Sequence, residues 1–151
     1  MGTSYTDYGS VGFWTHDATL ELWLYLLVAE IDADADPPAW IRQAREEWWR
    51  QATVGFVGHV SIDLDRHLLG IPERERDLLA LVERVGARIA AFDPAIPAAV
   101  ANGFGVGGGT EFRAGIETEL LQRCNAAVAG TIRGTPTWET GDDASGVWPR
   151  R

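Results

Sequence analysis

The segment from Asp36 to Gly70 constrains the fold more than any other part of this chain. Asp36 and Pro37 are typical of a helix start, because a short acidic side chain caps the first turn and proline lacks only an N–H that would be unpaired there. From Trp40 on there is no proline until Pro72, and apolar residues recur at every fourth position: Ala52, Phe56, Val60, Leu64 and Leu68. The segment therefore predicts one long central helix, or two nearly collinear helices, with a rise of about 1.5 Å per residue.

Glycines and tryptophans complicate this central helix. Gly55 and Gly58 each lower helix stability by about 1 kcal/mol relative to alanine. They therefore predict that another helix packs closely against this one, or that the helix bends next to a site. Trp40, Trp48 and Trp49 point to different sides of the helix, so two of its faces should be covered. The cover is the protein core, a partner or oligomer interface, or the wall of a ligand pocket.

The remaining sequence predicts three more helices. They run from Thr15 or Asp17 to about Ala33, from Pro72 to about Asp93, and from about Thr110 to Ile132, where Gly134 supplies a stop. A loose N-terminal arm (1–12), a Pro- and Gly-rich crossover (94–109) and an irregular tail (135–151) complete the chain. The expected fold is all-α: a single domain over residues 1–151, like a four-helix bundle, built around the long central helix.

Composition limits the classes of function. The 151 residues carry a formal net charge of −9, which disfavours binding to a nucleic-acid backbone and suits a basic protein partner. The single cysteine, Cys124, excludes an internal disulfide and predicts an inert core thiol. The longest apolar run, Leu22–Ala29, is too short to span a bilayer, and the N-terminus has no signal-peptide pattern. We therefore expect a cytoplasmic protein without membrane association.

Three residues of the central helix are candidates for chemistry. His59, Asp63 and His67 lie four residues apart, so a continuous helix would place them along one stripe. Either adjacent pair could hold a metal or act as acid and base, with the completing ligand from another helix: Glu21, Glu30 or Glu83. The alternatives are a partly buried polar flank of the apolar ridge, or a histidine-rich partner surface.

The glycine-rich segment from Gly103 to Thr110 precedes a predicted helix, as phosphate-binding loops do. However, no strand precedes the glycines, no lysine occurs anywhere in the chain, and Arg113 is the only nearby cation. We therefore expect a flexible crossover or lid, or a loop whose backbone approaches a ligand.

Two hypotheses for function follow. The first is a non-enzymatic, acidic helical domain that binds another protein or forms a homo-oligomer, for example an antitoxin or immunity-type neutraliser of a basic protein. The second is a helical bundle, an enzyme in one version, that binds a small molecule or metal between the glycine-rich crossover and the central helix. Its candidate ligand-binding residues are Trp48, Phe56, His59, Asp63 and Arg113. The sequence assigns neither a catalytic residue nor a cofactor.

Overall fold

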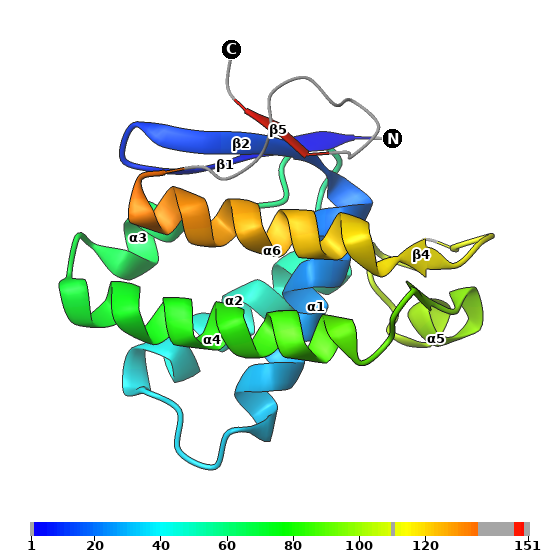
Figure 1. The fold of residues 1–151 in the computed structure, drawn as a ribbon, viewed down its shortest axis with the longest axis horizontal. Helices are drawn as coiled ribbons and strands as arrows, with labels where there is room; N and C mark the ends of the chain where they lie inside the picture. The colour runs from blue at the N-terminus through cyan, green and yellow to red at the C-terminus, as the bar shows by residue number, and fades with distance from the viewer. Residues whose placement is uncertain (1, 110, 136–146, 150–151) are drawn as a thin grey trace.

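The computed structural model describes residues 2–109, 111–135 and 147–149, which form six α-helices and five β-strands. The helices are α1 (Asp17–Ala33), α2 (Ala39–Val54), α3 (Leu64–Leu68), α4 (Pro72–Ala90), α5 (Ala98–Gly103) and α6 (Thr118–Arg133). The strands are β1 (Thr3–Tyr8), β2 (Val11–His16), β3 (Ala95–Ile96), β4 (Ile116–Glu117) and β5 (Val147–Pro149). The all-α prediction is therefore wrong, because the structure contains two small antiparallel sheets in addition to the helices (Figure 1).

The larger sheet begins in the segment that was expected to be a loose arm. β1 and β2 form an antiparallel hairpin in which Thr3 pairs with His16 and Tyr8 pairs with Val11. Gly9 has φ +60°, the left-handed conformation that a two-residue hairpin turn favours. Threonine and aromatic residues flank this turn, which is a strand signal that helical periodicity does not capture. β5 adds a third strand to β2 in the region of the expected irregular tail, of which residues 136–146 and 150–151 lie outside the described residues.

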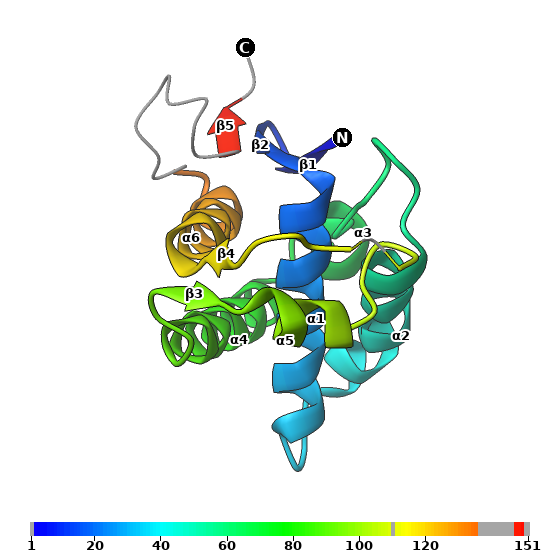
Figure 2. The same cartoon turned by 90° about the vertical axis from the view of Figure 1, so that its right-hand side faces the viewer.

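The spine of the fold is α1 and not the Asp36–Gly70 segment. Figure 2 shows α1 running between α4 and α6 on one side and α2 on the other. A helix that is apolar all round must be covered all round. Accordingly, α1 buries side chains that point in every direction: Leu20, Leu22, Trp23, Leu24, Leu26, Leu27, Val28 and Ile31.

The predicted long central helix is broken. α2 ends at Val54, residues 55–63 are not helical, and only the short α3 follows. Backbone amides of this non-helical loop donate to side chains instead of to the carbonyls one helical turn earlier. Gly58 N donates to Asp17 Oδ2 at 2.7 Å, and Val60 N donates to Ser4 Oγ at 2.9 Å. Tertiary hydrogen bonds thus replace the helical ones.

The glycine-rich crossover is also ordered by hydrogen bonds. Gly107 N and Gly108 N donate to the carbonyl oxygens of Ala52 and Thr53, at 2.8 and 2.7 Å. These carbonyls belong to the last turn of α2, where a helix leaves acceptors without intrahelical partners. The glycines have positive φ (61° and 65°), which lets the loop turn both amides toward the helix end. The loop therefore caps α2.

Two predicted helices agree well with the structure. α4 begins at Pro72 as expected, and its buried face contains the predicted Leu78, Val82, Val85 and Ile89. Gly134 ends α6 in a left-handed cap, also as expected. However, α6 begins at Thr118 and not near Thr110, because Ile116 and Glu117 form β4 against β3.

Candidate functional site

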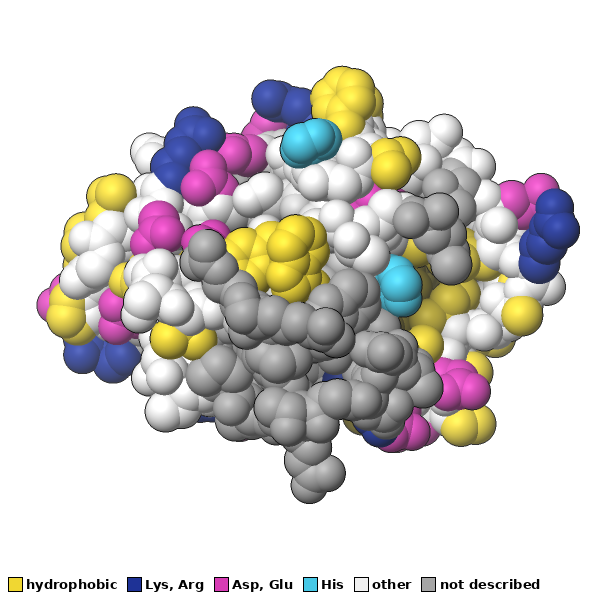
Figure 3. All heavy atoms as spheres, turned by 90° about the horizontal axis from the view of Figure 1, so that it is seen from above, with side chains coloured by type: hydrophobic (Ala, Val, Ile, Leu, Met, Phe, Trp, Pro, Cys, Tyr) yellow, Lys and Arg dark blue, Asp and Glu magenta, His cyan; other side chains and the backbone are white. Residues whose placement is uncertain are grey.

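The end of α2 and the loop after it expose apolar side chains to water. Val54, Phe56 and Val57 are 59%, 76% and 78% exposed, and we call these three residues the apolar tip. Figure 3 shows hydrophobic and histidine side chains reaching the surface together on the sheet side of the molecule. The other large hydrophobic residues exposed within the described chain, Leu69 and Val100, lie apart from the tip in the sequence. Clustered exposed apolar residues are typical of interaction sites, whereas single ones are ordinary.

Buried polar side chains hold the tip in place from the N-terminal side. Asp17, the first residue of α1, accepts hydrogen bonds from Ser4 Oγ at 2.5 Å and from Gly58 N at 2.7 Å. Ser4 Oγ in turn accepts a hydrogen bond from Val60 N. Ser4 and Asp17 are 1% and 7% exposed, so these bonds are shielded from competing water. The loop is therefore a defined structure that nevertheless presents apolar groups to solvent.

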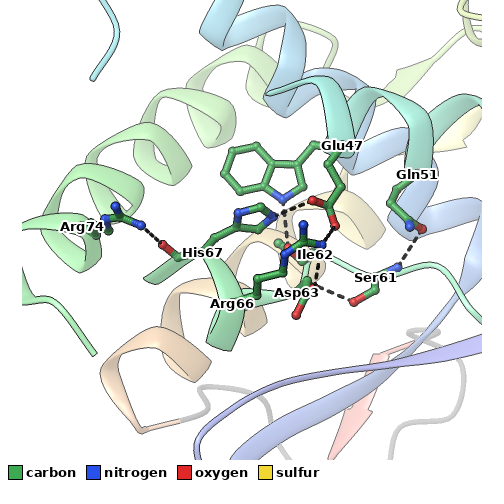
Figure 4. A network of polar contacts seen from close by, with 9 residues as sticks. Glu47, Gln51, Ser61, Ile62, Asp63, Arg66, His67 and Arg74 are labelled. Atoms are coloured by element: carbon green, nitrogen blue, oxygen red, sulfur yellow. Dashed lines mark hydrogen bonds and ion pairs between the residues drawn. The ribbon is translucent and has the colours of Figure 1, made fainter. Parts of the chain in front are cut away.

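A second polar cluster holds the other end of the loop (Figure 4). Trp48 Nε1 donates to the carbonyl oxygen of Ile62 at 2.9 Å, and its indole packs edge-on against His67 at 5.2 Å between ring centroids. His67 Nε2 lies 3.5 Å from Glu47 Oε2, and burial lowers the pKa of His67 from its ordinary value. Arg66 adds an ion pair to Glu47 at 3.0 Å. These contacts join α3 to α2 and fix the direction in which the chain leaves the loop.

A buried carboxyl group lies beneath the tip. Glu21 follows Asp17 by one helical turn on α1 and is 6% exposed. Burial, and secondarily the nearby Asp17 charge, raise the pKa of Glu21 from 4.5 to about 7. A Cβ atom placed on Gly55 would lie 3.2 Å from Glu21 Oε1, so the glycine allows the loop to pass close to this carboxyl group.

The structure does not gather the predicted ligand-binding residues into one site. Trp48 is fully buried in the core, whereas Phe56 and His59 are exposed on the loop. Asp63 precedes α3 with a left-handed φ of 53°. Arg113 is exposed before β4, and within the described chain no hydrogen bond or ion pair joins it to the other four.

The predicted histidine stripe does not form either. α2 ends before His59, so His59, Asp63 and His67 do not share a helical face. Among the described residues, no group of three histidine, cysteine, aspartate or glutamate side chains is arranged to hold a metal ion. The crossover amides that donate to α2 are likewise not arranged as an anion cradle.

The sequence did not indicate that Asp17 and Ser4 hold the loop. It named Glu21 only as a completing metal ligand, and not as a buried carboxyl group beneath the tip. One signal was present: two carboxylates spaced by four residues, immediately before the apolar run from Leu22 to Ala29. Carboxylates beside such a run are rarely buried without a reason.

No protein-family model, curated protein or solved structure matches the chain. Within the described residues, none of the helices combines the length and apolar character needed to cross a bilayer. Any assignment of function therefore depends on the geometry of the chain itself.

Proposed function

We propose that this chain is a non-enzymatic, acidic protein-interaction domain whose apolar tip binds a basic partner protein. An antitoxin or immunity-type neutraliser of a basic effector is the concrete version of this proposal. The observation that carries it is the exposure of Phe56 and Val57 on a loop anchored by buried hydrogen bonds. We further propose that this interaction takes place in the cytoplasm.

The energetics of the tip favour a protein partner. Covering a phenylalanine or valine side chain is worth about 1.5–3 kcal/mol, so the exposed tip represents binding energy that the monomer does not use. Because Asp17 and Ser4 already order the loop, a partner would pay little conformational entropy to bind it. Aromatic residues are enriched at the centre of protein interfaces, and Phe56 is the aromatic residue of the tip.

The charge of the chain selects among partners. A net charge of −9 repels a second copy and a nucleic-acid backbone, and it attracts a basic surface. The small-molecule alternative has less support, because its candidate residues are divided between the core, the loop and the segment before β4.

Site-specific photo-crosslinking tests the proposal. A benzophenone amino acid is placed at Phe56 or Val57 of the full chain, which is expressed in the source organism and irradiated. We expect an adduct with a basic protein, identified by mass spectrometry. The matched controls are Leu69 and Val100, which are exposed hydrophobic positions outside the tip. Equal crosslinking at all four positions, an adduct of two copies of this chain, or no adduct at the tip would contradict the proposal.

A further inference from the structure

A cavity lies at the turn of the β1–β2 hairpin, whereas the apolar tip lies beside Gly2 at the opposite end of β1. Its volume is about 460 Å³, within the range of about 300–1,000 Å³ that small-molecule sites occupy. The hairpin turn, α3 and the last turn of α6 contribute to its wall, and they lie at the same end of the molecule in Figure 1. We call it the hairpin cavity, and its lining includes Tyr8, Ser10, Val11, Asp65, Ile132 and Arg133.

The backbone leaves the hairpin cavity open. Gly9, Gly70 and Gly134 also line it, one from the hairpin turn, one from the residues after α3 and one from the end of α6. A Cβ atom added to any of these glycines would meet no atom within 4 Å beyond its own chain neighbours. The space beside the three backbone segments is therefore available to a ligand.

Hydrogen bonds hold the wall of the cavity in place. Tyr8 Oη donates to Glu75 Oε1 on α4 at 2.6 Å, and Gly9 N donates to Asp65 Oδ1 on α3 at 3.0 Å. These two bonds join the hairpin turn to two helices. The cavity is therefore formed before any ligand enters, which reduces the loss of conformational entropy on binding.

One acidic and one basic side chain line this cavity without pairing with each other. Asp65 lies on α3 and Arg133 lies at the end of α6. Among the described residues, no hydrogen bond reaches Asp65 Oδ2, and no hydrogen bond or ion pair involves the Arg133 guanidinium. Arg133 would repel a simple cation and Asp65 would repel a simple anion. Both side chains are satisfied by one ligand that carries both charges.

We propose that the hairpin cavity binds a small zwitterion, with its ammonium group at Asp65 and its carboxylate at Arg133. The guanidinium group presents parallel N–H donors that match a carboxylate, and Asp65 Oδ2 is an acceptor for the ammonium group. Val11 and Ile132 offer apolar surface to the methylene chain between the two charges. This inference goes beyond the proposed function, because the cavity shares no residue with the apolar tip.

Titration of the full ¹⁵N-labelled chain with unbranched ω-amino acids, from glycine to 6-aminohexanoate, tests the inference. The backbone amide signals of Gly9, Gly70 and Gly134 report on the cavity, and that of Gly103 on α5 is the internal control. We expect saturable shifts at the three reporters and the tightest binding at one chain length, because the protein fixes the separation of the two charged side chains. At that length the zwitterion should bind at least about threefold more tightly than the alkylamine or the alkanoate of equal length.

Two substitutions test the role of each charge. Arg133→Gln should remove the advantage of the zwitterion over the alkylamine, and Asp65→Asn should remove its advantage over the alkanoate. Asparagine keeps one oxygen that can accept from Gly9 N, so this substitution preserves the contact that holds the hairpin turn. Arg113→Gln is the matched control, since Arg113 is exposed and does not line the cavity, and it should bind as the unmodified chain does.

Several results would overturn the inference. They are the absence of saturable shifts at the three reporters, an equal shift at Gly103, equal binding of every chain length, or an alkylamine or alkanoate that binds as tightly as the best zwitterion. Phe56→Ser should leave the zwitterion titration unchanged, and Arg133→Gln should leave photo-crosslinking at the apolar tip unchanged. The cavity and the proposed function can therefore fail independently.

Discussion

Replacing Glu21 with glutamine should stabilise the protein at alkaline pH and leave it nearly unchanged at acidic pH. In the folded chain the pKa of Glu21 is about 7, against an ordinary value of 4.5. Between these two values the folded state keeps a proton that the unfolded state has already released. The free energy of unfolding therefore falls as the pH rises through this window, and the loss is complete above pH 7. Glutamine is neutral at every pH and does not suffer this loss.

The structure sets the size of the effect. One pKa unit corresponds to about 1.4 kcal/mol, so the full difference between 4.5 and about 7 has a ceiling of about 3 kcal/mol. Glu21 is 6% exposed and lies beneath a surface loop, so water screens part of the charge. We expect Glu21→Gln to gain about 1–3 kcal/mol relative to the unmodified chain between pH 5 and pH 8.

Urea denaturation at pH 5, 6, 7 and 8 measures this difference, with tryptophan fluorescence as the signal. Glu83→Gln, on the exposed face of α4, is the control and should show no pH-dependent change. Asp17→Asn should destabilise the chain even at pH 8, because Asp17 accepts from both Ser4 Oγ and Gly58 N and an amide has only one acceptor oxygen. A Glu21→Gln difference that is constant from pH 5 to pH 8 would refute the reasoning.

Three further predictions follow from the packing. Gly55→Ala should lower the free energy of unfolding in urea by about 1–3 kcal/mol, since its Cβ would lie 2.6 Å from a backbone carbonyl oxygen. Gly103→Ala, at the last residue of α5 with nothing within 4 Å, should instead raise it by up to about 1 kcal/mol, and equal effects would contradict this. Trp48→Phe should cost about 1–3 kcal/mol by the same assay, because it leaves the buried Ile62 carbonyl without its donor, and an unchanged stability would contradict this. Cys124 is fully buried with its pKa raised to about 12, so a thiol reagent should modify it only on unfolding, and rapid labelling of the native chain would disprove that.

The candidate site was only partly accessible from the sequence. The Phe56 and Asp63 positions were selected, but for a ligand pocket on a continuous helix. The apolar tip was hidden because Phe56 falls in register with Ala52 and Val60, so periodicity assigned it to the buried ridge. In the structure Ala52 and Val60 are buried and Phe56 is 76% exposed.

Local signals in the sequence were sufficient to predict the ends of helices that are amphipathic. Pro72 starts α4 and Gly134 ends α6, as the sequence predicts. These features depend on residues within a few positions of one another, so a short window of sequence contains the relevant energies.

Tertiary structure alone decided where the Asp36–Gly70 segment breaks. The acceptors for Gly58 N and Val60 N belong to Asp17 and Ser4, which are 41 and 56 residues away in the chain. Helical hydrogen bonds and these long-range ones satisfy the same amides, so local propensity cannot choose between them. The choice is made when the β1–β2 hairpin packs at the start of α1 and brings Ser4 to Asp17. That contact also leaves the apolar tip in water.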